Sequence, residues 1–428
     1  MTTRFNIAIL VVFTMFMCSC NQQQKKEESM QSQHSVTAKD ILGNPDYQAI
    51  SYGGYRMTSR EFQPTVSQLK EDMKILQALN IKVLRTYNVQ LAQASNLLKA
   101  ITQLKQEDPK FEMYVMLGAW IDCKNAWTDK EPDHTQESEH NQGEIERAVA
   151  LANQYPDIVK VLAVGNEAMI RWATSYFVQP DVILKWVTYL QNLKKEGKLP
   201  KDLWITCSDD YASWGGGDPS YQVEDLELLI KAVDYVSMHT YPYHNTHYNP
   251  EFWGVEDDES DLTAEEQIEA AMNRALQFAQ NQYKRVSKYV RSIDSTKSIH
   301  IGETGWATVS NGHYGPTGSK ATDELKQAMY YRSMREWTNK EGIACFYFEA
   351  FDEPWKDAQN SLGSENHFGL FTVDGKAKHV LWNDVDNDTF KDLTRDKNNI
   401  GKTFGGDKSE LLKTVQVPAV KDSIAVKL

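Results

Sequence analysis

Eight continuous apolar stretches recur along the chain, and each ends in polar or aromatic residues. Continuous apolarity, without alternation, is typical of strands that are buried on both faces, as in a parallel sheet. The stretches are 49–56 (AISYGGYR), 81–88 (IKVLRTYN), 111–120 (FEMYVMLGAW), 159–167 (VKVLAVGNE), 203–210 (LWITCSDD), 233–243 (VDYVSMHTYPY), 298–306 (SIHIGETGW) and 343–353 (IACFYFEAFDE).

Amphipathic segments separate these stretches, with apolar residues three or four positions apart, which is one face of a helix. Examples are Leu69, Met73, Leu76 and Leu79; Ile183, Trp186, Leu190 and Leu193; and Leu325, Met329 and Trp337, the last group preceded by Thr322 and Asp323 as candidate caps. Strand–helix alternation repeated eight times predicts an α/β fold, a (β/α)8 TIM barrel. We expect one catalytic barrel over residues 43–385, with insertions at 121–141 and 244–262 over its C-terminal mouth. Residues 386–428 would form a C-terminal extension whose role the pattern does not define.

The first residues differ from the rest. A basic Arg4, a short apolar run and the sequence Met17-Cys18-Ser19-Cys20 resemble a bacterial lipoprotein signal. We therefore expect a signal peptide at 1–19, lipidation of Cys20 and a polar, flexible tether at 20–42. Cys18 is the poorer candidate because bulky Met17 precedes it. These features predict a protein held on the outer membrane of a Gram-negative bacterium, at its periplasmic or cell-surface face, through a lipid anchor only.

Composition narrows the possible partners. The formal net charge is −13, which argues against nucleic acid as a partner. The 11 Trp and 20 Tyr are suited to stacking on sugars, although large cores also use aromatic residues. Cys123, Cys207 and Cys345 show neither disulfide nor metal spacing and read as small buried hydrophobic residues. We expect a monomer that needs no cofactor. We also expect no metal site, since the spacing of His239, His244 and His247 matches no zinc motif.

Two glutamates end strands that would face each other across the barrel mouth. Glu167 closes the fourth stretch and Glu303 lies near the end of the seventh. Catalytic groups of such barrels come from the C-terminal ends of strands. Glycoside hydrolysis uses two carboxyl groups, and a separation of about 5 Å gives a covalent intermediate with retention of configuration. Asn166, beside Glu167, could hydrogen-bond the 2-hydroxyl of a sugar.

The motifs VGNE (164–167), GETGW (302–306) and FEAFDEPWK (348–356), followed by HFGLFTVDGKAK (367–378), resemble the signature strands of glycoside hydrolase family 17. The similarity covers about residues 48–384. It implies a (β/α)8 enzyme that acts on β-1,3-glucans, without a cofactor. The resemblance assigns Glu167 as acid/base and Glu303 as nucleophile.

The same resemblance implies roles for further residues. Arg85 and Tyr87 match the second-strand pattern, in which the arginine supports the charge of the nucleophile. Tyr52 matches the first-strand aromatic, and Glu353 with Lys356 matches a Glu-x-x-Lys pair that shapes the cleft or, alternatively, forms an ion pair at the rim. His239 and Tyr241 could line the subsite beside the scissile bond, but His239 could equally be a hydrogen-bonded histidine of the barrel mouth. Trp306 is a candidate sugar platform, with packing as the alternative.

The leading hypothesis is a retaining endo-β-1,3-glucan hydrolase with a laminarin-like glucan, as polysaccharide or oligosaccharide, for its substrate. A β-1,3-glucanosyltransferase would use the same pair of glutamates, because a sugar hydroxyl would replace water in the second step. GETGW is closer to the fungal and bacterial forms, which include both activities. A non-catalytic glycan-binding surface lipoprotein is the third hypothesis, against which the presence of both glutamates argues.

Overall fold

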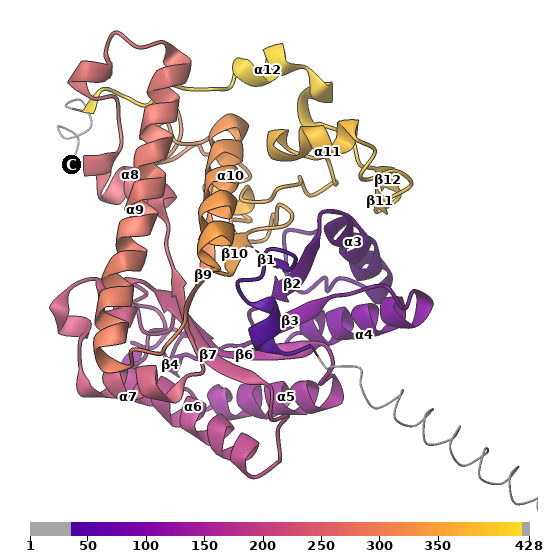
Figure 1. Cartoon of the computed structure of the whole chain (residues 1–428), viewed down its shortest axis with the longest axis vertical. Coiled ribbons are helices and arrows are strands. Elements are labelled where there is room, and N and C mark those ends of the chain that lie inside the picture. Colours follow the sequence, from indigo (N-terminus) through magenta and orange to yellow (C-terminus); the bar gives the residue numbers. More distant parts are fainter. Residues whose placement is uncertain (1–35, 422–428) are drawn as a thin grey trace, which may run out of the picture. The chain divides into compact units, whose positions relative to one another are not determined.

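Eight parallel strands close into a barrel in the computed structural model, which describes residues 36–421 (Figure 1). Around the barrel the order is β1-β10-β9-β8-β7-β6-β3-β2. The strands are β1 (Gln48–Ser51), β2 (Ile81–Arg85), β3 (Tyr114–Ala119), β6 (Val159–Asn166), β7 (Trp204–Asp210), β8 (Val236–His239), β9 (Ile299–Gly305) and β10 (Cys345–Phe348). Nearly every residue in them is buried, as continuous apolarity predicts.

Helices follow the strands and cover the outside of the barrel. They are α3 (Val66–Ala78), α4 (Ala92–Glu107), α5 (His140–Gln154), α6 (Pro180–Lys195), α7 (Glu224–Ala232), α8 (Pro242–Tyr248), α9 (Ala264–Ile293), α10 (Glu324–Glu341) and the short α11 (Trp382–Asp386). Two small hairpins are added, β4 (Cys123–Lys124) with β5 (Asp133–Glu137) and β11 (Thr394–Arg395) with β12 (Asn398–Asn399).

The predicted (β/α)8 barrel is confirmed. Each of the eight apolar stretches contains one barrel strand, and the three helices read from their spacing are α3, α6 and α10. Of the two candidate caps of α10, Asp323 is the one that accepts a hydrogen bond from the backbone N–H of Lys326. The three cysteines within the described residues are free and buried, as expected.

The fold begins earlier than the predicted boundary at residue 43. Residues that the sequence analysis assigned to the tether form the short helix α2 (Ala38–Ile41), whose Ala38 and Ile41 are buried. The polar composition of residues 20–35 hid this transition, because only two apolar side chains mark it. The predicted signal peptide, Cys20 and the predicted tether up to residue 35 lie outside the described residues.

The C-terminal extension packs on the barrel through a buried charge cluster. Arg395 lies 3.0 Å from Asp72 of α3, and both side chains are fully buried. Asp72 also receives hydrogen bonds from Tyr52 (2.8 Å) and Arg56 (2.9 Å). The guanidinium of Arg395 lies 4.0 Å from the ring centroid of Phe351. The extension therefore neutralises a buried carboxylate of the barrel, which would be costly if it were left unpaired.

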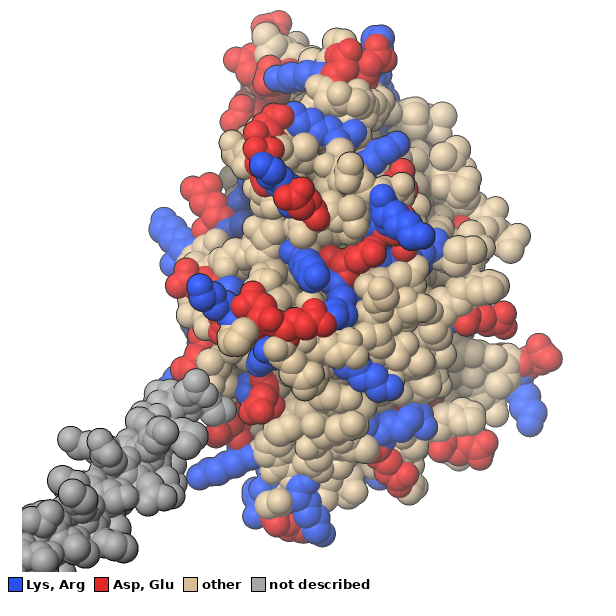
Figure 2. Space-filling model, turned by 90° about the vertical axis from the view of Figure 1, so that its right-hand side faces the viewer, with Lys and Arg blue, Asp and Glu red and all other residues tan. Residues whose placement is uncertain are grey.

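Acidic and basic side chains are interspersed over the face that carries α3, α4 and the β11–β12 hairpin (Figure 2). Within the part of the chain that the structure describes, this face shows no clustered basic patch of the kind that nucleic acid binds. Among the described residues, no helix has the length and apolarity needed to cross a membrane.

We predict that Arg395→Ala destabilises the protein, because it leaves Asp72 with one buried cation fewer. The free energy of unfolding should fall by about 3 kcal/mol, measured from urea denaturation midpoints. Lys413→Ala is the matched control. It removes the exposed partner of Glu410, so the change should stay within about 0.5 kcal/mol. An Arg395→Ala protein as stable as wild type would contradict the role given to this contact.

Candidate active site

The end of β6 is bent so that it presents two polar side chains at the mouth of the barrel. The pairing of β6 with β7 shifts between Ala163 and Asn166. Gly165 has a φ of +82°, and a Cβ there would lie 2.9 Å from the Cβ of Ala168. Only glycine adopts this conformation without strain. The bulge explains why a core strand ends in Gly165 and then exposes Asn166 and Glu167.

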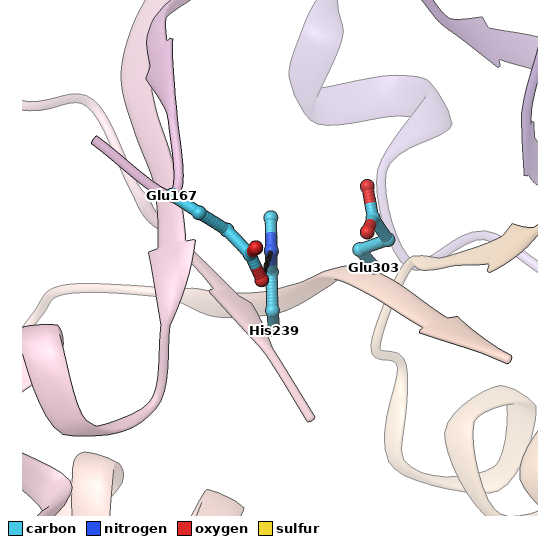
Figure 3. A group of neighbouring side chains, drawn as sticks. All are labelled: Glu167, His239 and Glu303. Carbon is cyan, nitrogen blue, oxygen red and sulfur yellow. Dashed lines mark hydrogen bonds and ion pairs between the residues drawn. The ribbon is translucent and has the colours of Figure 1, made fainter. Parts of the chain in front are cut away.

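The two predicted glutamates meet at this mouth. An oxygen of Glu167, an oxygen of Glu303 and a nitrogen of His239 all lie within 4.8 Å of one another. Figure 3 shows Glu167 directed at His239, with Glu303 beside them on the neighbouring strand. This separation is in the range of retaining glycosidases, below the 6.5–9.5 Å or so that inverting enzymes need for an intervening water.

Glu303 is held by three donors. Its Oε2 accepts hydrogen bonds from the Arg85 guanidinium and the Tyr87 hydroxyl, each 2.6 Å long. Its Oε1 accepts one from the Tyr241 hydroxyl, also 2.6 Å. Arg85 is itself fixed by the carbonyl oxygen of Gly302 (2.8 Å) and by Oδ1 of Asn166 (2.5 Å). The predicted residues of the second strand and Tyr241 therefore converge on Glu303.

These contacts keep Glu303 ionised. Burial by itself would raise the pKa of Glu303, but neighbouring groups lower it below its ordinary value. A charged His239 would contribute, yet burial lowers the pKa of His239 to about 4, so this imidazole is neutral at pH 7. The Arg85 charge and the hydroxyls of Tyr241 and Tyr87 thus account for the lowered pKa of Glu303.

Glu167 has the opposite surroundings. Burial, followed by the negative charge of Glu303, raises the pKa of Glu167 to about 8, against a smaller lowering by Arg85. Its Oε1 lies 3.0 Å from Nδ1 of His239, whose Nε2 lies 2.8 Å from Oγ of Ser208. Glu167 is therefore the protonated carboxyl group of the pair at neutral pH and Glu303 the ionised one. A general acid needs the first state and a nucleophile needs the second.

Two residues that the sequence analysis did not assign hold this geometry. Ser208 fixes the far nitrogen of His239, and its carbonyl oxygen accepts the N–H of Glu167 at 3.0 Å. Asp209 accepts the N–H of Met169 at 2.7 Å. Through this contact Asp209 braces the loop after Glu167. Their position at the end of the fifth apolar stretch was the only signal for them.

Three residues predicted to contact the substrate are buried in the structure. Tyr52 is 1% exposed and its hydroxyl donates to Asp72 of α3. Trp306 is 0% exposed, and its Nε1–H donates to the carbonyl oxygen of Ala321. Its ring centroid lies 5.1 Å from that of Tyr330, so its role is packing. His239 is also 0% exposed, with both ring nitrogens engaged, so it is the hydrogen-bonded histidine of the mouth.

Glu353 and Lys356 belong to a buried cluster. Lys356 Nζ lies 2.7 Å from Glu349 and 3.7 Å from Glu353. Glu353 also accepts the N–H of Tyr55 (3.0 Å) and Nε1–H of Trp355 (3.0 Å) and is 2% exposed. The closer partner of Lys356 is Glu349, which the Glu-x-x-Lys spacing did not indicate, and contact of Glu353 with substrate stays a prediction. Lys356, Asn166, Tyr87 and Tyr241 remain partly exposed.

Glu167, His239 and Glu303 are the group that could reach a metal ion among residues 36–421. Arg85 places a fixed positive charge 2.6 Å from Glu303, which opposes a second cation at that carboxylate. The donor set instead suits acid–base and nucleophilic chemistry at a glycosidic bond.

A family model agrees with this site. The model of the BtgE/BtgC glycoside hydrolase domain matches residues 49–369, which include all eight barrel strands but for one residue of β1. Probable glucan endo-1,3-beta-glucosidases of Aspergillus flavus and Aspergillus oryzae are each 25% identical over 366 residues, which is 81% of this chain and 45% of theirs. The chain therefore spans about half the length of these curated relatives.

Two solved structures extend the comparison. The crystal structure of an endo-laminarinase from Formosa Hel1_33_131 is 66% identical with a TM-score of 0.89, over 90% of this chain and 98% of that chain. A glycoside hydrolase family 17 β-1,3-glucanosyltransferase from Rhizomucor miehei, 20% identical with a TM-score of 0.54 over 78% of this chain and 96% of that chain, shares the fold. The resemblance predicted from the strand-end motifs is confirmed, and the chain belongs to the BtgE/BtgC glycoside hydrolase domain family.

Proposed function

We propose that this chain is a retaining endo-β-1,3-glucan hydrolase of the laminarinase type. The observation that carries the proposal is the carboxyl pair within 4.8 Å, one member ionised and one protonated. The endo-laminarinase from Formosa supports the substrate class, because the likeness covers 98% of that chain at 66% identity. The names of the Aspergillus relatives point to the same linkage.

In the first step Glu303 attacks the anomeric carbon. Its Oε2 is bound by Arg85 and Tyr87, and its Oε1 by Tyr241, so the carboxylate is ionised and oriented before substrate binds. Pre-orientation of this kind removes part of the entropic barrier of the step. As the bond to carbon forms, negative charge leaves Glu303, which weakens its hydrogen bonds with the hydroxyls of Tyr87 and Tyr241.

Glu167 handles the proton. In the first step it gives its proton to the leaving glycosidic oxygen, and in the second it takes a proton from the attacking water. Neutral His239 suits both stages, because Nδ1–H can donate to Oε1 of Glu167 whether or not Oε2 carries the proton that goes to the leaving oxygen. Ser208 can complement either tautomer, since a hydroxyl both donates and accepts.

We also propose that the chain works at the envelope of a Gram-negative bacterium, anchored through Cys20 to the outer membrane. The support is the sequence of residues 1–35, with its basic start, short apolar run and polar tether. A glucan too large to cross the membrane would then be cut outside the cytoplasm, by a monomer that contacts the membrane through its lipid alone.

Glu303→Ala should lower kcat on linear laminarin by at least about 10³-fold, because the nucleophile is lost. The measurement is release of reducing ends, with chromatographic sizing of products over time. Glu410→Ala, which changes an exposed glutamate of α12 (Lys408–Leu412), should match wild type. Retention of activity within about tenfold would rule out Glu303 as nucleophile. Early products longer than the starting oligosaccharide would favour the transferase hypothesis.

Glu167→Gln should lower activity most on substrates whose leaving group needs a proton. Cleavage of laminarin should fall by at least about 10²-fold, whereas formation of the intermediate from a 2,4-dinitrophenyl β-glycoside should fall far less. Wild-type kcat/KM should decline as the pH rises through the raised pKa of Glu167, because the acid form is lost. That alkaline decline should vanish in Glu167→Gln on the activated substrate. Equal losses on both substrates would refute the acid assignment.

Cys20→Ala should release the protein from membranes. We expect full-length wild type, expressed in a Gram-negative host, to incorporate labelled palmitate and to sediment with the outer membrane, whereas Cys20→Ala does neither. Cys18→Ala is the control and should behave as wild type. Labelling that survives in Cys20→Ala would disprove this anchor.

A further inference from the structure

Three aromatic rings from separate parts of the chain form a cluster beside the active site. Trp120 follows β3, Trp127 lies in the β4–β5 hairpin and Tyr176 lies in the loop between Glu167 and α6. The ring centroids of Trp127 and Tyr176 are 5.1 Å apart with the planes at 23°, so these rings are stacked. Trp120 lies 5.3 Å from Tyr176 and 6.4 Å from Trp127.

The backbone conformation of Trp127 is unfavourable for a bulky residue. It is 63% exposed, and its φ is +61°, a left-handed conformation that bulky side chains rarely adopt. An exposed ring gains little from burial, and apart from its stacking on Tyr176 folding gives no reason to hold a tryptophan there. Binding of a flat apolar ligand surface would give one, and the face of a glucosyl ring is such a surface.

The cluster is fixed to the loop that carries Glu167. The N–H of Cys123, at the start of the hairpin, donates to the carbonyl oxygen of Tyr176 at 3.0 Å. The rings of His134 and Phe177 stack at 3.7 Å, and Nδ1 of His134 lies 2.8 Å from the carbonyl oxygen of Phe177. Two residues past Tyr176, the N–H of Val178 donates to the carbonyl oxygen of Ala168 at 2.7 Å. Hairpin and loop therefore form one support.

The cluster lies on the side of Glu167. Trp120 follows β3, which pairs with β6, the strand that ends next to Glu167, whereas β7 and β8 lie between β6 and the strand β9 that carries Glu303. Glu167 is the group that protonates the leaving oxygen, so the part of the glucan that departs first lies on its side of the cleft.

We propose that Trp120, Trp127 and Tyr176 form a stacking platform for a glucosyl residue on the leaving-group side of the scissile bond. The inference rests on the proposed function, since it takes the substrate to be a β-glucan. The platform binds the departing chain in hydrolysis. It also binds an acceptor chain, which occupies the same side during transfer.

The test compares two substrates that differ on the leaving-group side. Laminarihexaose leaves a sugar chain there, whereas 4-nitrophenyl β-laminaribioside leaves only one small ring next to the cleaved bond. Trp127→Ala should lower kcat/KM on laminarihexaose about tenfold, the loss of one aromatic contact, and leave the nitrophenyl substrate within about twofold. Trp127→Phe should recover most of the loss. Transfer products at high oligosaccharide concentration should also decrease in Trp127→Ala.

Trp172→Ala is the matched control, because Trp172 lies in the same loop as Tyr176 and is 64% exposed. It should match wild type on both substrates, with thermal denaturation checking that each variant is folded. Equal loss on both substrates, or none in Trp127→Ala, would overturn the platform. If wild type cleaves neither substrate, the proposed function fails instead. The platform is then judged by calorimetric binding of laminarihexaose, which Trp127→Ala should weaken about tenfold and which an unchanged affinity would refute.

Discussion

The contact between Arg85 and Glu303 is the interaction on which the site depends. Both side chains are buried, and the guanidinium reaches the carboxylate at 2.6 Å. Burial alone would favour the neutral form of both glutamates at the mouth. Arg85, with the hydroxyls of Tyr241 and Tyr87, favours ionisation of Glu303, because Glu303 has these short contacts and Glu167 does not. The ionised Glu303 then raises the pKa of Glu167. One cation and two hydroxyls thus set two different roles for two chemically identical groups.

The backbone of the barrel positions these groups close together. Arg85 ends β2, Asn166 ends β6, His239 ends β8 and Glu303 lies in β9, so four strand ends supply the arrangement. Closure of the sheet places them around one rim. The bulge at Gly165 turns Glu167 into the mouth, and Ser208 of the adjacent strand binds both its N–H and its imidazole partner. The rigid strands therefore provide the precision that the chemistry needs.

The strands, the barrel and the catalytic pair could be predicted because each leaves a local pattern. The substrate role predicted for Trp306 overlooked the geometry of its strand, unlike the roles predicted for Tyr87 and Tyr241, which contact Glu303. Side chains alternate along a strand, so Trp306 lies on the opposite side from Glu303, together with Thr304, whose hydroxyl contacts Tyr330 of α10 at 2.7 Å. The alternation of side chains therefore places Trp306 opposite Glu303 from the sequence alone. Nothing local, in contrast, links Arg395 to Asp72 or Trp127 to Tyr176, because those contacts exist only after folding.

The groups around Glu303 and the proposed aromatic platform lie in parts of the fold that differ in how freely they can vary. The groups that touch Glu303 come from strand ends and are held on several sides, so a change at any of them disturbs the reaction. Trp127 comes from a hairpin outside the barrel, which can vary in length and composition while the strands stay as they are. Its link to the loop of Glu167 is through the backbone of Cys123 and Tyr176. A glucan bound on the platform is thus positioned relative to Glu167 by rings that, within the described residues, make no hydrogen bond to either glutamate of the pair.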